Sequence, residues 1–303
     1  GVMPPRLRIA FLGLPLAALL LQRDGHEVVI AGLRKGLTLG ARRLARQMPA
    51  QGVVIDPHRD WPAFAAALQE LAPDLLVSWF FTRRIPMRVC RACRLGGIGV
   101  HPSLLPRHRG PDPFFAAIDS GDDVTGVTVH RIEAQYDTGA ILGQERLAVD
   151  PGWNAWRLAR ALDRPSLRAL RATVARAASG DPLQGTPQQE ALATEAPSPD
   201  DEARVLRWSW SAERIVRRIR ALAPNPGAVA WVEDRELVVL EAQVADEVPL
   251  ALEAGEAAVV QGRAVVRAAD AGVALLRAEI DGTLVGPEEL ALMVAQASLP
   301  LVT

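Results

Sequence analysis

The stretch WPAFAAALQELAPDLLVSWF, residues 61–80, contains both kinds of element from which the fold is predicted. Its first part, residues 61–71, spaces its apolar side chains along one face of a helix. Its second part, residues 74–80, is a continuous apolar run of strand length. A strand that is apolar throughout is typical of a parallel sheet covered on both faces. The stretch therefore indicates a helix followed by a buried strand.

The same alternation recurs over residues 5–150. The other predicted strands are residues 7–12, 27–32, 52–55, 97–100 and 127–132. Right-handed crossovers between them give a doubly wound, mostly parallel α/β domain. Ligands of such domains bind beyond the carboxyl ends of the strands. The loops after Phe80 and Val100 are therefore the first candidates for a binding site.

The rest of the chain predicts a second domain. Residues 153–179 have the apolar spacing of a helix, and residues 181–203, rich in Pro, Gln, Glu, Ser and Asp, are interpreted as an exposed linker. A further helix at 211–222 precedes short β runs separated by turns, the pattern of a small barrel. We expect a catalytic domain over residues 1–180, a linker over 181–203, and a C-terminal β-barrel (OB-like) domain over 204–303.

Composition limits the classes of partner. A net charge of −1 and a pI of about 6.6 argue against a protein that coats nucleic acid or an anionic membrane. No apolar run reaches the ~18 residues of a spanning helix. The run 9–21 is interrupted by Gly13 and Pro15, so a strand, a turn and a short helix explain it better than a signal peptide. Two cysteines make no disulfide framework, and we expect a reducing, cytoplasmic compartment.

A loop dense in glycine, proline and polar residues follows the predicted strand 97–100. It runs from Gly96 to Gly110 and reads GGIGVHPSLLPRHRG. His101 comes at the carboxyl end of the strand, where an imidazole either faces a cleft or packs as a cap. Glu133 and Asp137 follow the next strand, in a position where an acid most often forms an Asx turn.

Other motifs predict structure more than chemistry. Cys90 and Cys93 form a lone CxxC without the further ligands of a zinc site, so we expect packing and no metal. The glycines at 96–99 lack the order of a dinucleotide fingerprint. The arginine-rich segments 34–43 and 214–220 are interpreted as solvated faces, with RNA contact as the alternative.

Several segments together resemble the folate-dependent formyltransferase family. His101-Pro102-Ser103-Leu104-Leu105-Pro106-x-x-Arg109-Gly110 is similar to the signature loop of that family, and Thr125-Gly126-Val127-Thr128 with Asp137-Thr138-Gly139 matches it in order and spacing. The linker and the run 219–228 resemble the methionyl-tRNA formyltransferases within the family. The resemblance covers nearly the whole chain and implies the formyltransferase fold with a small C-terminal barrel.

The resemblance implies transfer of a formyl group from 10-formyltetrahydrofolate, as co-substrate, to an amine. It assigns His101 as a donor to the developing oxyanion, and Asp137 as the acid that orients water and the imidazole and helps to move protons. The implied cofactor-binding residues are Thr82, Arg83, Arg84, Ile85, Cys90, Ile132, Glu133 and Ala134.

Position 99 departs from the family pattern, which has an asparagine two residues before the histidine. This chain has Gly99, which offers no side-chain donor. Loss of one oxyanion donor costs about 10²–10³ in rate. Either water or another group fills the gap, or the extra room admits a bulkier transferred group or a different reaction.

Three functions are therefore expected in order. The first is an N-formyltransferase-like enzyme acting on a small amine or an aminoacyl group. The second is a catalytically degenerate member that binds a ligand or partner without formyl transfer. The third is a methionyl-tRNA formyltransferase. We do not favour tRNA, because the pI is low and residues 32–44, which resemble a tRNA-gripping insertion, form a short segment. No membrane partner is expected.

Overall fold

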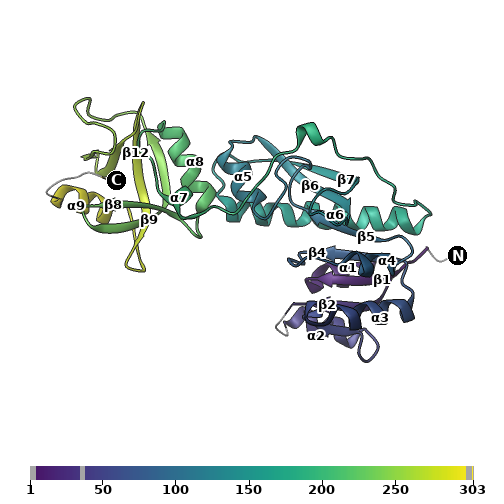
Figure 1. Cartoon of the computed structure of the whole chain (residues 1–303). Coiled ribbons are helices and arrows are strands. Elements are labelled where there is room, and N and C mark those ends of the chain that lie inside the picture. The colour runs from purple at the N-terminus through teal and green to yellow at the C-terminus, as the bar shows by residue number, and fades with distance from the viewer. Residues whose placement is uncertain (1–4, 35–37, 298–301, 303) are drawn as a thin grey trace. The chain divides into compact units, whose positions relative to one another are not determined.

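A computed structural model of the chain describes residues 5–34, 38–297 and 302 (Figure 1). Within these residues the chain forms two compact units. The first comprises the described residues up to 110 together with 126–147 and 162–195, and the second comprises residues 111–125 and 148–161 together with the described residues from 196 onward. The units thus alternate along the chain between residues 111 and 195. The domain boundaries at 180 and 204 stay a prediction.

Seven strands form the sheet of the first unit, in the order β3-β2-β1-β4-β5-β6-β7. Their bounds are β1 Arg8–Gly13, β2 Glu27–Leu33, β3 Val53–Ile55, β4 Leu75–Trp79, β5 Gly97–His101, β6 Val124–Arg131 and β7 Ile141–Ala148. Strands β1 to β5 pair in parallel, whereas β6 runs antiparallel to β5. The prediction of a mostly parallel α/β sheet is confirmed.

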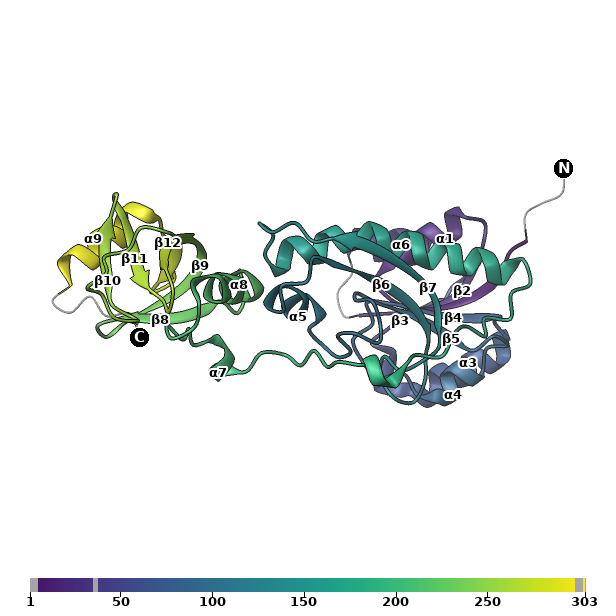
Figure 2. The same cartoon turned by 90° about the horizontal axis from the view of Figure 1, so that it is seen from above.

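Helices cover both faces of this sheet. Figure 2 shows α1 (Pro15–Arg23) and α6 (Ala155–Ala178) on one side, and α3 (Trp61–Leu71) and α4 (Met87–Arg91) on the other. The packing of strand β1 explains why its residues 9–12 are all apolar. Ile9 and Phe11 pack in the cluster that includes α1 and α6, whereas Ala10 and Leu12 pack in the cluster that includes α3 and α4. Both faces of the strand are therefore buried, as the sequence pattern predicts.

The shorter helices complete this part of the chain. They are α2 Leu39–Arg46 and the 3₁₀ turns Pro57–Asp60 and Glu190–Leu192. Thr38 caps α2 by accepting a hydrogen bond from the Ala41 amide. The segment 32–44, which resembles a tRNA-gripping insertion, includes the end of β2 and, from Leu39 onward, most of α2. Lys35, Gly36 and Leu37 of this segment lie outside the described residues.

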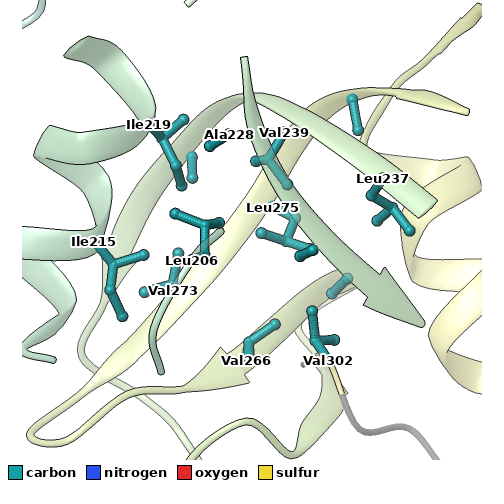
Figure 3. Packing of buried hydrophobic residues seen from close by; sticks show 14 of the residues in the cluster. Leu206, Ile215, Ile219, Ala228, Leu237, Val239, Val266, Val273, Leu275 and Val302 are labelled. Atoms are coloured by element: carbon teal, nitrogen blue, oxygen red, sulfur yellow. The ribbon is translucent and has the colours of Figure 1, made fainter. Parts of the chain in front are cut away.

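An antiparallel sheet forms the core of the second unit, in the order β10-β11-β12-β9-β8, with β13 paired to β12. Its strands are β8 Ala228–Val232, β9 Arg235–Ala245, β10 Ala257–Val260, β11 Arg263–Arg267, β12 Gly272–Ile280 and β13 Thr283–Val285. The helices of the second unit include α5 Pro113–Asp119, α7 Asp201–Arg204, α8 Ala212–Leu222 and α9 Pro287–Gln296. Ile215 and Ile219 of α8 pack against the sheet residues Val239 and Leu275 (Figure 3). A separate β domain is thus confirmed.

The length and the apolar character of a helix decide whether it can cross a membrane. In the described part of the chain, no helix combines the length and the apolar character needed to cross a bilayer.

Candidate active site

The site loop, residues 101–110, leaves the carboxyl end of β5 beside the loop that leaves β4. The two strands are parallel neighbours, with Ser78 opposite Gly99, so both loops emerge at the same edge of the sheet. Thr128 of β6 holds the start of the site loop: its Oγ1 donates to the Ser103 carbonyl at 2.8 Å and accepts from the Leu105 amide at 3.0 Å. The loop is therefore tied to the sheet by buried hydrogen bonds.

His101 and Asp137, which the resemblance pairs, lie next to each other in the structure. Nδ1 of His101 is 3.3 Å from Oδ1 of Asp137, and both side chains are largely buried. Nε2 of the same ring is 2.7 Å from the backbone carbonyl of His108. Because a carbonyl only accepts, Nε2 carries a proton and donates it. Nδ1 then faces the carboxylate, and a hydrogen bond between these two groups requires a second proton on one of them.

Asp137 is fixed by backbone contacts. Its residue adopts a left-handed conformation with φ of 59°, and its Oδ2 accepts a hydrogen bond of 2.9 Å from the Gly110 amide. Gly139 allows the chain to turn tightly here: a Cβ at this position would lie 1.8 Å from the Arg131 carbonyl oxygen. The end of the site loop and the turn at 137–139 are thus locked together.

The segment interpreted as a linker supports this arrangement through its contacts with Arg109 of the site loop. The Arg109 guanidinium donates to both carboxylate oxygens of Glu190, at 2.7 and 2.8 Å, and to Oε1 of Gln188 at 2.7 and 3.1 Å. Gln188 in turn donates to the carbonyls of Asp137 and Gly139, each at 2.8 Å. Most side chains of this segment are exposed, as expected, yet three of its residues bind the site loop, since the Thr194 carbonyl also accepts from the Arg109 amide.

Gly99 is directly opposite His130 in the antiparallel pairing of β5 and β6. A Cβ at Gly99 would lie 3.8 Å from both Cε1 and Nε2 of the His130 ring. The same Nε2 is 4.0 Å from Oδ1 of Asp137. Two imidazoles, His101 and His130, therefore flank one carboxylate. Sequence reasoning did not select His130, because only the strand register brings it beside Gly99.

The loop after β4 carries four of the predicted cofactor residues. Thr82 and Arg83 line a pocket of about 250 Å³ together with other, mostly charged or polar, residues: Arg34, Asp56, His58, Arg59 and Phe81. Arg84 is used differently, because its guanidinium donates to the Ala134 carbonyl at 3.0 Å. That bond connects this loop to residues 132–134, which are three of the four other predicted cofactor residues.

The remaining predicted cofactor residues differ in exposure. Ile85 and Ile132 are half-buried, and Glu133 and Ala134 are exposed. Cys90 is only 2% exposed and lies in the core with α3 and α4. The cofactor-binding roles of these residues stay a prediction.

The two cysteines are buried thiols. Burial raises the pKa of Cys90 to about 11 and that of Cys93 to about 12. A thiol that stays protonated at neutral pH is a poor nucleophile and a poor metal ligand. Among the described residues, no group of three His, Cys, Asp or Glu side chains is placed to hold a metal ion.

Several arginines of α8 are bound within the second unit. Arg218 donates to both carboxylate oxygens of Asp119, at 2.7 and 3.1 Å, and Arg220 donates to the Trp153 carbonyl at 3.2 Å. The Arg214 guanidinium lies over the Trp210 ring, 3.7 Å from its centre. The interpretation of this segment as a solvated face is therefore wrong for Arg218, whose side chain is 13% exposed.

Comparison with known proteins identifies the family. Residues 41–174 match the formyl transferase family, and residues 200–289 match the formyl transferase C-terminal domain. The chain is also 36% identical over 292 residues to a methionyl-tRNA formyltransferase of Anaeromyxobacter dehalogenans, with 91% of this chain and 93% of that protein covered. The chain belongs to the formyl transferase family. The family resemblance of the sequence motifs is thus confirmed.

Solved structures of formyl transferases and related proteins share the fold. HypX from Aquifex aeolicus, solved in complex with tetrahydrofolic acid, matches with a TM-score of 0.66 and 21% identity, over 96% of this chain and 48% of HypX. Glycinamide ribonucleotide transformylase 1 from Symbiobacterium toebii matches with a TM-score of 0.50 and 26% identity, over 58% of this chain and 89% of that protein. The second match covers less of this chain than the first does, so only part of this chain shares the fold of that protein.

Proposed function

We propose that this protein transfers the formyl group of 10-formyltetrahydrofolate to a primary amine, with His101 and Asp137 as its catalytic pair. The observation that carries the proposal is the 3.3 Å approach of His101 Nδ1 to Asp137 Oδ1 at the carboxyl edge of the sheet. Membership of the formyl transferase family supports the reaction, and the fold likeness to a protein solved with tetrahydrofolic acid supports the folate.

The residues fit such a reaction. Attack of an amine on the formyl carbon creates an oxyanion and a positive charge on the amine nitrogen. A buried carboxylate beside an imidazole stabilises the positive charge and provides a route for the proton. The pocket with Arg34, Arg59 and Arg83 is suited to the carboxylates of a folate tail, because it combines three guanidinium groups with one carboxylate, Asp56, which lies 3.7 Å from Arg59.

The test measures folate binding and formyl transfer separately. Titration with a stable 10-formyltetrahydrofolate analogue is expected to give saturable binding, and His101→Ala is expected to keep that binding while losing about 10²–10⁴ in transfer rate. Absence of binding up to millimolar analogue would contradict the proposal. Binding without transfer to any amine tested would instead support a degenerate, ligand-binding member.

A second candidate names the acceptor as the aminoacyl group of methionyl-tRNA. The observation in its favour is the 36% identity to a methionyl-tRNA formyltransferase across both parts of the chain. The net charge of −1 and the internal bonds of Arg218 and Arg220 reduce the basic surface available for tRNA. Transfer to methionyl-tRNA is compared with transfer to free methionine and to small sugar amines at several salt concentrations. A tRNA acceptor predicts a steep loss of binding with salt, and equal rates on free amines would exclude it.

A further inference from the structure

His130 is a buried histidine in the site to which the family mechanism gives no role. Its side chain is 9% exposed, and its ring edge, Cε1 and Nε2, faces the space above Gly99. The backbone at Gly99 is ordinary extended strand, so its conformation does not require a glycine. The ring and the glycine therefore form one feature: a histidine next to the place where the family has an asparagine.

An asparagine side chain at 99 would lie directly against the ring of His130. A Cβ at 99 would already be in van der Waals contact with His130 on one side and with Cγ1 of Ile132, 3.7 Å away, on another. A longer side chain directed along the strand pair meets the ring. The glycine thus leaves room that the imidazole faces.

The protonation of His130 follows from its hydrogen bonds. Nδ1 lies 2.9 Å from the Arg131 carbonyl, which only accepts, so Nδ1 carries the proton of the neutral ring. Nε2 is then unprotonated and carries a lone pair, and no described residue donates a hydrogen bond to it. Both ring nitrogens of His101, by contrast, have partners, namely the His108 carbonyl and Asp137.

The surroundings keep this ring neutral. Burial lowers the pKa of His130, and the neighbouring His101 lowers it further, whereas the Arg131 carbonyl and Asp137 act in the opposite direction. The titratable groups that face the ring are therefore His101 from β5 and Asp137 from the turn after β6. Gly99 and Ile132 contribute no charge. A neutral imidazole with an available lone pair is a proton acceptor, whereas the amide nitrogen of the asparagine that the family has at position 99 is a donor.

We propose that His130 is the general base of this site. The proposal rests on the proposed formyl transfer. The amine nitrogen bonds to the formyl carbon, and the carbonyl electron pair moves to oxygen. Nε2 of His130 takes one proton from the nitrogen that has attacked. The electron pair on the oxyanion then re-forms the carbonyl bond while the bond between the carbon and N10 breaks and leaves its electron pair on N10. N10 receives the proton from Nε2. The amine loses one proton and the folate gains one, so the step balances without a further reactant.

The first test replaces the ring and supplies a base in solution. His130→Ala is expected to lower the formyl-transfer rate by about 10²–10⁴ while leaving the binding of the folate analogue within a few-fold of wild type. Added imidazole is expected to restore rate in His130→Ala, in proportion to its unprotonated fraction, because the variant leaves a cavity of imidazole size. His101→Ala serves as the matched control, since its ring is tied to His108 and Asp137 and imidazole should restore less.

The second test examines the shared space. Gly99→Asn in the wild-type background is expected to lower the midpoint of denaturant unfolding, because the amide meets the ring. The double variant Gly99→Asn/His130→Ala is expected to recover that loss. His130→Gln places a side chain of similar length that does not titrate. The pH profile of its transfer rate should therefore lack the fall at low pH that protonation of His130 causes in the wild type.

The outcomes separate the two proposals. Transfer by His130→Ala within a few-fold of wild type, or a loss of rate that comes with weakened folate binding and no imidazole rescue, would overturn the role as a base. A wild-type chain that binds folate but transfers no formyl group would overturn the proposed function itself, and with it the base. If the wild type transfers formyl and His130→Ala transfers it nearly as fast, the role of His130 as a base is overturned but the proposed function stands.

Discussion

The guanidinium of Arg109 and the carboxylate of Glu190 form a two-point ion pair, with Nη1 2.8 Å from Oε2 and Nη2 2.7 Å from Oε1. Arg109 is 7% exposed, whereas the Glu190 side chain is 70% exposed. The glutamate thus comes from the surface to satisfy a buried cation. Hydrogen bonding to Glu190 raises the pKa of Arg109, and the same bond lowers the pKa of Glu190.

Loss of this pair should loosen the site loop. Arg109→Leu removes the donors to Gln188 and Glu190 and should lower the free energy of unfolding by about 1–3 kcal/mol. It should also lower the transfer rate, because Gln188 and Gly110 both contact Asp137. Denaturant melts and steady-state kinetics measure the two effects. Glu190→Gln is the control, because it removes the charge of the ion pair but leaves the contact of Arg109 with Gln188. If Arg109→Leu loses no more rate and stability than Glu190→Gln, the prediction that Arg109 holds the site loop is wrong.

The turn at Gly139 should tolerate no side chain. In Gly139→Ala the new Cβ would meet the Arg131 carbonyl oxygen at 1.8 Å, so the turn that carries Asp137 must move. We expect a loss of at least about 1–3 kcal/mol in unfolding free energy and a fall in transfer rate. Gly99→Ala is the control for stability, because its Cβ makes only ordinary contacts and should change stability by no more than about 1 kcal/mol. Equal melting curves for the two variants would refute the prediction.

The cysteines should be silent to thiol reagents in the folded protein. The pKa values of about 11 and about 12 for Cys90 and Cys93 keep both thiols protonated at pH 8, and both side chains are buried. A chromogenic disulfide reagent should therefore react with neither thiol under native conditions and with both in denaturant. Fast modification of the native protein at pH 8 would show that α4 opens or that the thiols have a chemical role.

Stability should fall as the solution becomes mildly acidic. Burial lowers the pKa of His26 below its ordinary value, with Asp24 opposing the shift, and burial also lowers the pKa of His130. The unfolded chain therefore binds protons first, below a pH of about 6.5. The contribution to stability is complete above that pH and is lost as the pH falls toward the folded-state values.

Variants at His26 separate this effect from general acid unfolding. Nδ1 of His26 accepts a hydrogen bond of 3.2 Å from the Leu7 amide, and the oxygen of a glutamine can accept in its place. His26→Gln should thus flatten the dependence of unfolding free energy on pH between about 5 and 7. Urea melts across this range provide the measurement. An unchanged slope in both His26→Gln and His130→Gln would assign the pH dependence to other groups.

The amino-acid sequence by itself determined the fold class and the position of the two groups that the family uses. Continuous apolar runs such as 7–12 and 74–80 predict strands buried on both faces, because period-two alternation disappears when both faces are covered. Motif spacing around His101 and Asp137 indicated the family. Strand β7 and helix α2 were not predicted, since β7 has exposed and half-buried residues in turn and α2 carries three arginines in eight residues.

Tertiary structure alone decided what surrounds those two groups. That Gly99 is opposite His130 depends on the register of β5 and β6, which a sequence without that register does not specify. That Gln188 and Glu190 reach Arg109 depends on how a polar, mostly exposed segment folds back over the site loop. Both relationships join residues distant in the chain through hydrogen bonds and contacts that leave no local periodic pattern, and for that physical reason only the folded chain reveals them.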